Sequence, residues 1–533
     1  MTTGGPNRRL PSVMSHDFSR VPSAEIPRSS FDRSYGHKTT FDAGYLIPIM
    51  VEEILPGDTF NVRANAFGRL ATPLHPFMDN LYFDTQFFFV PNRLLWDNWQ
   101  KFNGEQDNPA DSTDFVIPQV VAPVGGYTEN SLGDYMGLPT GLDGLSVSAL
   151  FFRAYNLIWN EWYRDQNLQD SVVVDKDDGP DTVADYVLLR RGKRHDYFTS
   201  ALPWPQKGPA VPLPLAGDAP VKGIGTFGAG FVNAGLSVRE TGETANTTFA
   251  QSEATSNAGT VQIEEDPNNA GFPGVFADLS SVTATTINAL RQAFQIQKLY
   301  ERDARGGTRY TEIVRSHFGV VSPDARLQRP EYLGGSSQPI NVNPVAQTSE
   351  TGVGTPQGNL AAIGTLTVPG HGFVKSFTEH GIIIGLASVR ADLNYQQGVD
   401  RMWSRSTRWD FYWPALSHIG EQAVLNKEIY FQNAAADDDV FGYQERFAEY
   451  RYKRSQITGE FRSQAAASLD SWHLAQDFSA LPTLSASFIE ENPPVDRVIA
   501  VNTEPHIILD IYFKMVCARP MPMYSVPGLI DHF

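Results

Sequence analysis

The sequence predicts an all-β fold, organised around one antiparallel core that long loops interrupt. Two stretches in which apolar and polar residues alternate, residues 81–90 and 507–517, carry this prediction from opposite ends of the chain. The 533 residues include 44 glycines and 36 prolines, so much of the chain between strands is expected in turns and loops. Jelly rolls accept insertions of this kind between their strands.

Residues 81–90 are predicted to form a central strand. One face of this strand carries Leu81, Phe83, Thr85, Phe87 and Phe89. The other face becomes apolar at Phe88 and Val90, so we expect that end of the strand to be covered on both sides.

The first 70 residues are expected to form an arm followed by strands. Residues 1–40 hold six basic and three acidic residues among many serines and prolines, which is typical of a solvated arm. The same composition also fits an extended arm that reaches a neighbour or nucleic acid. Residues 47–70 read as strands that a turn at 55–58 interrupts.

Two helices are predicted outside the β core. In the first, apolar residues at helical spacing follow a candidate cap at Ser146; they are Val147, Leu150, Phe151, Ala154, Ile158 and Trp162. The second begins at Ile287 and is stopped by the glycine pair 306–307.

The remaining segments differ in character. Residues 217–286 are rich in small and polar residues, and between 240 and 290 there are seven acids and no Lys or Arg, so we expect this segment to project into solvent. Residues 373–393 are expected to supply further strands. The three acids 437–439 predict an exposed turn, and 507–517 form the last strand.

Charge and cysteine usage restrict the partners. The net charge of −18 argues against a general nucleic-acid binder, because neutralising phosphates requires basic surface. One cysteine fits folding in a reducing cytoplasm. The first residues lack the apolar run of a signal peptide, and no apolar stretch reaches membrane-spanning length.

Local contacts with DNA are nevertheless predicted at three clusters. The candidate residues are Arg8 and Arg9 in the arm, Arg190, Arg191, Lys193 and Arg194 in the densest basic cluster, and Arg401, Trp403, Arg405, Arg408 and Trp409 in an aromatic segment. Arginines interleaved with aromatics are typical of single-strand stacking platforms. The alternative for residues 401–413 is that the rings pack in the core or at a subunit seam while the arginines pair with acids. For residues 190–194, a solvated face or contact with a neighbour's acidic patch is the alternative.

No catalytic, metal or cofactor site is predicted. The glycine motif 223–228 neither follows a clear strand nor opens a helix, so it does not fit dinucleotide binding. Cys517 lies on the apolar face of a strand, which favours a buried side chain. The histidines form no zinc motif, and the acids of 175–181 have the wrong spacing for an EF-hand. The acids 437–439 could bind a cation, but a solvated turn is favoured.

Several stretches resemble the major capsid protein of gokushoviruses, single-stranded DNA phages of the Microviridae. They include the segments 38–48, 55–61, 79–82, 87–93, 152–162, 303–312, 322–335 and 517–533. The resemblance covers nearly the whole chain outside residues 210–285, which fall where this family carries a variable insertion.

The resemblance implies a function and a set of partners. We expect a non-enzymatic capsid protein with an eight-stranded jelly roll spanning residues 41–533, many copies of which form a T=1 icosahedral shell around circular single-stranded DNA. The implied partners are further copies, the packaged DNA, a small basic DNA-binding protein, pilot or internal virion proteins, and a receptor on the bacterial host that residues 217–286 would contact. Assembly would take place in the host cytoplasm. The alternative function is a jelly-roll carbohydrate-binding module or glycan-active enzyme.

Overall fold

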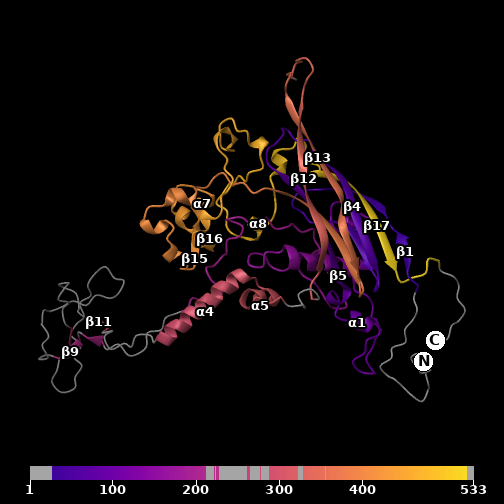
Figure 1. The fold of residues 1–533 in the computed structure, drawn as a ribbon, viewed down its shortest axis with the longest axis horizontal. Coiled ribbons are helices and arrows are strands. Elements are labelled where there is room, and N and C mark those ends of the chain that lie inside the picture. The colour runs from indigo at the N-terminus through magenta and orange to yellow at the C-terminus, as the bar shows by residue number, and fades with distance from the viewer. Residues whose placement is uncertain are drawn as a thin grey trace, which may run out of the picture. The chain divides into compact units, whose positions relative to one another are not determined.

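The structure is a computed structural model of the 533-residue chain, and its fold is drawn in Figure 1. It describes residues 27–211, 221–222, 224–226, 261–263, 276–277, 287–321, 328–354 and 356–524. The chain divides into two compact units, one made of residues 1–205 and 307–533 and the other of residues 206–306.

The first unit is built on nine antiparallel strands. They are β1 (Ser29–Asp32), β2 (Tyr35–Phe41), β3 (Ile47–Ile54), β4 (Thr59–Leu70), β5 (Leu81–Pro91), β12 (Glu331–Ala346), β13 (Leu360–Ser376), β14 (Gly381–Ala391) and β17 (Ile507–Arg519). The strand order is β1-β17-β4-β13-β12-β5-β14-β3, and β2 pairs with β17 beside β1. Four strands, β2-β17-β4-β13, form one sheet, and β12-β5-β14-β3 form the other. The predicted eight-stranded jelly roll is therefore confirmed.

The strand β12 connects the two sheets. Its first part, Glu331–Ile340, pairs with β5, and its second part, Asn341–Ala346, pairs with β13. This second part and β13 form a two-stranded ribbon that projects past the ends of the neighbouring strands (Figure 1).

The main hydrophobic core lies between the two sheets. The strand β17 alternates strictly and buries Ile507, Leu509, Ile511, Phe513, Met515 and Cys517, as predicted. From the facing sheet, Phe87 packs against Phe373 with ring centroids 5.5 Å apart. Each fully buried aromatic ring of this kind contributes about 1.5–3 kcal/mol to folding.

A second core covers the outer face of the sheet that contains β5. Phe88 and Val90 point into it and are fully buried, which confirms that this end of β5 is covered on both sides. All eleven residues of β14 are buried for the same reason. The covering layer includes α3 (Leu150–Ile158), whose Tyr155 hydroxyl donates to the Leu46 carbonyl at 2.9 Å.

The remaining elements of this unit are short. The helices are α1 (Trp99–Phe102), α2 (Leu132–Tyr135), α5 (Tyr310–Phe318), α7 (Asn426–Ile429) and α8 (Ala486–Ile489). The strands are β6 (Gln119–Val121), which pairs with β7 (Ser146–Ser148), and β15 (Glu421–Leu425), which pairs with β16 (Val440–Glu445).

Three local predictions need correction. Ser146 does not cap the first helix, because residues 146–148 pair as β7 and α3 starts after Ala149 without a side-chain cap. The arm is shorter than 40 residues, since β1 and β2 both pair with β17. The turn at 437–439 is only partly exposed, because Asp437 is buried and accepts hydrogen bonds from the backbone N–H groups of Gln432 and Ala434.

The second unit contains the predicted second helix, α4 (Ile287–Gly306). The residue that follows the helix, Gly307, has a positive φ of 96°. Its described strands are β8 (Val221–Lys222), β9 (Ile224–Thr226), β10 (Val261–Ile263) and β11 (Phe276–Ala277). Most of residues 217–286, for which we predicted a protrusion, lie outside the described residues. Among the described helices, none combines the length and apolarity that a membrane crossing requires.

Candidate nucleic-acid interface

The basic cluster 190–194 is largely held inside the jelly-roll unit. The Arg190 guanidinium lies 4.0 Å from the centroid of the Tyr45 ring and donates to the Glu491 carbonyl at 3.0 Å. Arg191 donates to the Asp84 carboxylate at 2.6 Å and to the Ser388 hydroxyl at 2.8 Å. Arg191 therefore ties the segment to β5 and β14, while Arg190 ties it to the loops that contain Tyr45 and Glu491.

The last two cations of the cluster differ from each other. The Lys193 ammonium donates to the Phe488 carbonyl at 2.6 Å, and burial lowers its pKa below the ordinary value. The side chain of Arg194 is exposed, as is that of His195. Of the four predicted residues in this cluster, Arg194 has the position that suits a phosphate contact best.

Two arginines of the aromatic segment 401–413 point inward and meet acids. Arg401 donates to the Ala423 carbonyl at 2.6 Å and to Glu428 at 3.1 Å. Arg405 donates to Glu449 at 3.2 Å. This is the pairing of arginines with acids that the sequence left open as the alternative to DNA contact.

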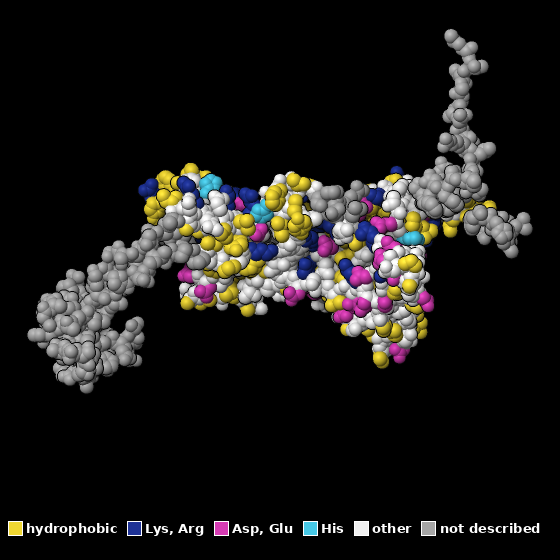
Figure 2. Space-filling view, turned by 90° about the horizontal axis from the view of Figure 1, so that it is seen from below, with side chains coloured by type: hydrophobic (Ala, Val, Ile, Leu, Met, Phe, Trp, Pro, Cys, Tyr) yellow, Lys and Arg dark blue, Asp and Glu magenta, His cyan; other side chains and the backbone are white. Residues whose placement is uncertain are grey.

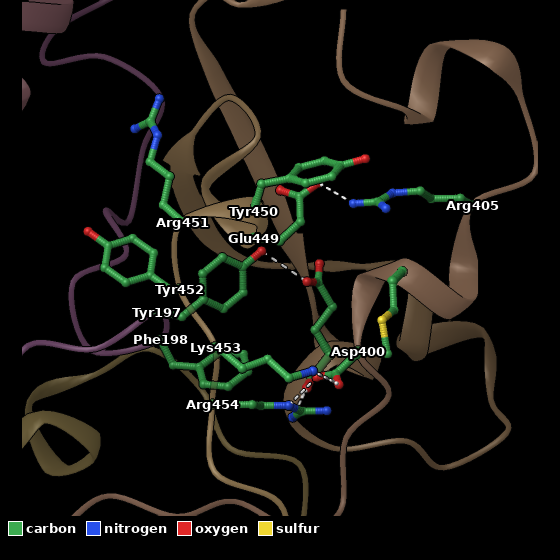
Figure 3. Close-up of a pocket in the computed structure, with 12 residues that line it drawn as sticks. Tyr197, Phe198, Asp400, Arg405, Glu449, Tyr450, Arg451, Tyr452, Lys453 and Arg454 are labelled. Carbon is green, nitrogen blue, oxygen red and sulfur yellow. Dashed lines mark hydrogen bonds and ion pairs between the residues drawn. The ribbon is translucent and has the colours of Figure 1, made fainter.

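These acids line a pocket of about 320 Å³ that Figure 3 shows. In it the Tyr197 hydroxyl donates to Glu428 at 3.0 Å, while Asp400 is paired with Arg454. Burial raises the pKa of Glu428 although Arg401 opposes the shift. For Asp400 burial acts in the same direction, but Arg454, Lys453 and Gln456 together outweigh it and hold the pKa of the carboxyl below its ordinary value.

The aromatic rings of the segment, in contrast, face solvent. The exposed fractions are 75% for Trp403, 59% for Trp409, 52% for Phe411, 51% for Tyr412 and 40% for Trp413. We call these five rings the aromatic patch. Arg408 is exposed beside them, and its guanidinium lies 4.6 Å from the centroid of the Trp413 ring.

Short local contacts fix the backbone below the patch. Asp410 accepts hydrogen bonds from the backbone N–H groups of Thr407 and Ser406, which lower the pKa of its carboxyl to about 2. The Trp413 indole N–H donates to the Arg408 carbonyl at 3.1 Å. Tyr412 packs edge-on against the buried Phe447, with ring centroids 5.2 Å apart.

The predicted DNA-contact residues thus fall into separate groups. Arg8 and Arg9 lie outside the described residues. The clusters 190–194 and 401–413 each place some cations on internal acceptors and leave others exposed. No sequence pattern indicates the partners Asp84, Glu428 and Glu449, because their distances along the chain from these arginines follow no regular spacing.

Charges of both signs are interspersed on the surface. Figure 2 shows basic and acidic side chains intermixed over the face it draws, without a continuous basic track among the described residues there, and acidic ones gathered toward its lower right. No group of three or more His, Cys, Asp or Glu residues in the described ranges is arranged to hold a metal ion. Cys517 is fully buried, as predicted.

Comparisons with known proteins agree with this architecture. The family model described as Capsid protein (F protein) matches residues 19–529. The chain is 51% identical to Capsid protein VP1 of Bdellovibrio phage phiMH2K, over 97% of this chain and 98% of that protein. It is 47% identical to Capsid protein VP1 of Chlamydia phage 1, with 98% and 99% of the two chains covered. For Capsid protein VP1 of Spiroplasma virus 4, the identity is 38% and the coverage 96% and 97%.

The match includes both ends of the jelly roll and the long insertions between its strands. The members of the matching family are structural proteins of phage particles. The family therefore does not support the alternative of a sugar-binding module or a glycan-active enzyme. The chain belongs to the capsid protein (F protein) family and is a structural, non-enzymatic capsid protein of the gokushovirus type within the Microviridae.

Proposed function

We propose that copies of this chain close into a T=1 icosahedral shell around a circular single-stranded DNA genome. One observation carries this proposal: the capsid family model matches residues 19–529, which include the jelly roll and the long insertions between its strands. Each copy would meet its symmetry mates through the same surfaces, so identical contacts repeat until the shell closes.

Electron microscopy of the purified chain tests the shell. We expect closed particles of one diameter above a threshold protein concentration. Filaments, open sheets or subunits that stay dissociated at every concentration would contradict the proposal.

The DNA is proposed to meet the shell only locally. A chain with a net charge of −18 cannot neutralise a packaged strand, and Arg190, Arg191 and Lys193 already have acceptors inside the fold. A separate small basic protein would supply most of the counter-charge, and pilot or internal proteins would complete the particle. Mass spectrometry of DNA-filled particles should therefore detect a basic protein or a polyamine. DNA-filled particles that contain this chain alone would refute the charge argument.

Arg194 is the described residue of the basic cluster that we propose for direct contact, together with Arg8 and Arg9. Replacing Arg194 with Gln should weaken binding of single-stranded DNA and reduce the slope of log affinity against log salt by about 0.7. Arg69→Gln, on the exposed face of β4, is the matched control for the loss of one charge. Equal losses in both variants would mean that net charge, and no particular site, determines binding.

Residues 217–286 are proposed to protrude outward and contact the host surface. The support is their acidic, small-residue composition. Limited proteolysis of intact particles should cut within this segment first. Protection of the segment in intact particles, with cleavage only after disruption, would place it inside and overturn the proposal.

Assembly is proposed to take place in the cytoplasm of the bacterial host. A single cysteine, fully buried on β17, means that folding requires no disulfide within the chain. Subunits expressed in a reducing cytoplasm should therefore fold and assemble there. A requirement for export before folding would contradict this.

A further inference from the structure

We propose that the aromatic patch, Trp403, Trp409, Phe411, Tyr412 and Trp413, is a contact surface that a second copy of this chain covers. The inference rests on the proposed assembly and adds to it the surface through which copies meet. Four observations carry it: the amount of ring surface exposed, the charge around it, the rigidity of the backbone below it and a pocket beside it.

The exposed ring surface is comparable to the largest apolar patch on a typical monomer, and such a patch is often a functional surface. The five rings leave between 40% and 75% of their surface exposed. Since a large aromatic side chain carries about 150–250 Å², together they expose on the order of 500 Å². The largest apolar patch on a monomer is about 300–600 Å², and one partner of a standard interface contributes about 800 Å². The patch can therefore form the centre of an interface.

The charge around the patch does not suit a nucleic-acid backbone. Residues 400–454, which contain the patch and its supporting acids, hold nine acidic and eight basic residues, a net charge of −1. Arg401 and Arg405 are directed at Glu428 and Glu449. Stacking platforms for single-stranded DNA combine rings with a positively charged groove, and here the positive charge is neutralised locally. A protein surface, whose interface centre is rich in aromatics and Arg, fits better.

The patch is also held in place before any partner binds. The Trp413 indole is tied to the Arg408 carbonyl, and the Trp409 carbonyl accepts from Arg446 at 3.3 Å. Tyr412 is supported by Phe447. Rings fixed in this way lose little conformational entropy on association, so more of their burial energy remains as affinity.

A pocket lies beside the patch and could receive a side chain of the partner copy. Met402 and Tyr450 line this pocket of about 320 Å³, and Arg405 lies between it and the patch, 4.3 Å from the Tyr450 ring centroid and 5.6 Å from that of Phe411. Interface residues that fill such pockets at the centre of a contact carry most of the binding energy. A side chain from the second copy can enter here.

A double variant, Trp403→Ser with Trp409→Ser, tests the proposal. Both indoles are exposed, so the unassembled subunit should unfold at an unchanged temperature. The protein concentration at which particles form, measured by light scattering and electron microscopy, should rise at least tenfold. Arg408→Gln is the matched variant: it removes the exposed cation but keeps the rings, and the assembly threshold should stay within twofold.

Oxidative footprinting provides a second readout that needs no substitution. Trp403 and Trp409 should react at least tenfold more slowly in particles than in dissociated subunits. Equal reactivity, or a double variant that assembles at the wild-type threshold, overturns the proposal. If protection requires packaged DNA and is absent from DNA-free particles, the patch is a nucleic-acid surface and the proposal is also overturned. Failure of the wild-type chain to form particles under any condition would instead refute the proposed shell.

Discussion

The ion pair between Arg153 and Asp181 should be one of the most sensitive positions in the jelly-roll unit. Arg153 lies on α3, and neither side chain of the pair is exposed to solvent. The guanidinium donates to the two carboxylate oxygens at 2.5 and 2.8 Å, and also to the carbonyl groups of Leu95 and Asp177 at 3.0 Å each. The pair thus fastens the loop 177–181 to the helix that covers the sheet.

Replacing Arg153 with Met would keep much of the side-chain volume but leave the Asp181 carboxylate buried with the Tyr186 hydroxyl as its donor. Removing one partner of a buried ion pair costs about 3–5 kcal/mol. We expect this loss in the free energy of unfolding of the unassembled subunit, measured by denaturant titration. Asp181→Asn should cost a similar amount, because it leaves the buried guanidinium with only the exposed Asp177 carboxylate, 3.5 Å away, as an acidic partner.

The double variant Arg153→Met with Asp181→Asn completes a thermodynamic cycle with the two single variants. Since no buried charge remains, it should be more stable than either single variant, and the cycle should give a coupling of several kcal/mol. A loss below about 1 kcal/mol for Arg153→Met, or simple additivity of the two losses, would refute the reasoning.

Three further predictions concern other positions. Burial raises the pKa of Glu491 above its ordinary value of 4.5 in the folded state, so the folded subunit holds this proton more tightly than the unfolded chain does and loses stability as the pH rises above about 4.5. Glu491→Gln should remove that part of the pH dependence of the free energy of unfolding, and an unchanged profile would contradict the prediction. A Cβ at Gly372 would lie 1.9 Å from the Val62 carbonyl oxygen in the pairing of β13 with β4, so Gly372→Ala should reduce the yield of soluble subunit severely. Gly36→Ala, where the added Cβ would meet only the Ile511 carbonyl oxygen at 3.8 Å, should cost far less in the same solubility assay. Burial raises the pKa of the Cys517 thiol, so a thiol reagent should label the subunit only as fast as it unfolds, and rapid labelling under native conditions would count against a buried β17.

The strands that could be predicted from the sequence are those in which every second side chain is buried in a hydrophobic core. In β5 and β17, alternate residues face a hydrophobic core, and the period of two is visible in the sequence. The strands β1 and β2 were missed because they lie at the edge of the sheet on β17, where half of their side chains are polar and exposed. The long strand β12 also lacks the pattern, since it contains glycine and proline and changes partner along its length.

The candidate site was predictable only at the level of residue type. The sequence shows arginines and aromatics together at 401–413, and both interpretations considered for it were physically sound. What decides between them is where Glu428 and Glu449 lie, and these acids come from later segments that only the fold brings to Arg401 and Arg405. The same holds for Arg191, which is paired through Asp84 on β5.

The position of β17 between β4 and the N-terminal strands has a consequence for synthesis on the ribosome. The backbone N–H of Ala43 donates to His506, across 463 residues of sequence, just where β2 and β17 begin to pair. At about 5–20 residues per second, roughly half a minute to a minute and a half separates the translation of these two strands. During that time β2 and β4 lack the strand between them, and the core that β17 covers stays open. A nascent chain that lacks β17 therefore cannot complete this sheet, so we expect the jelly roll to finish folding only after translation has passed residue 519.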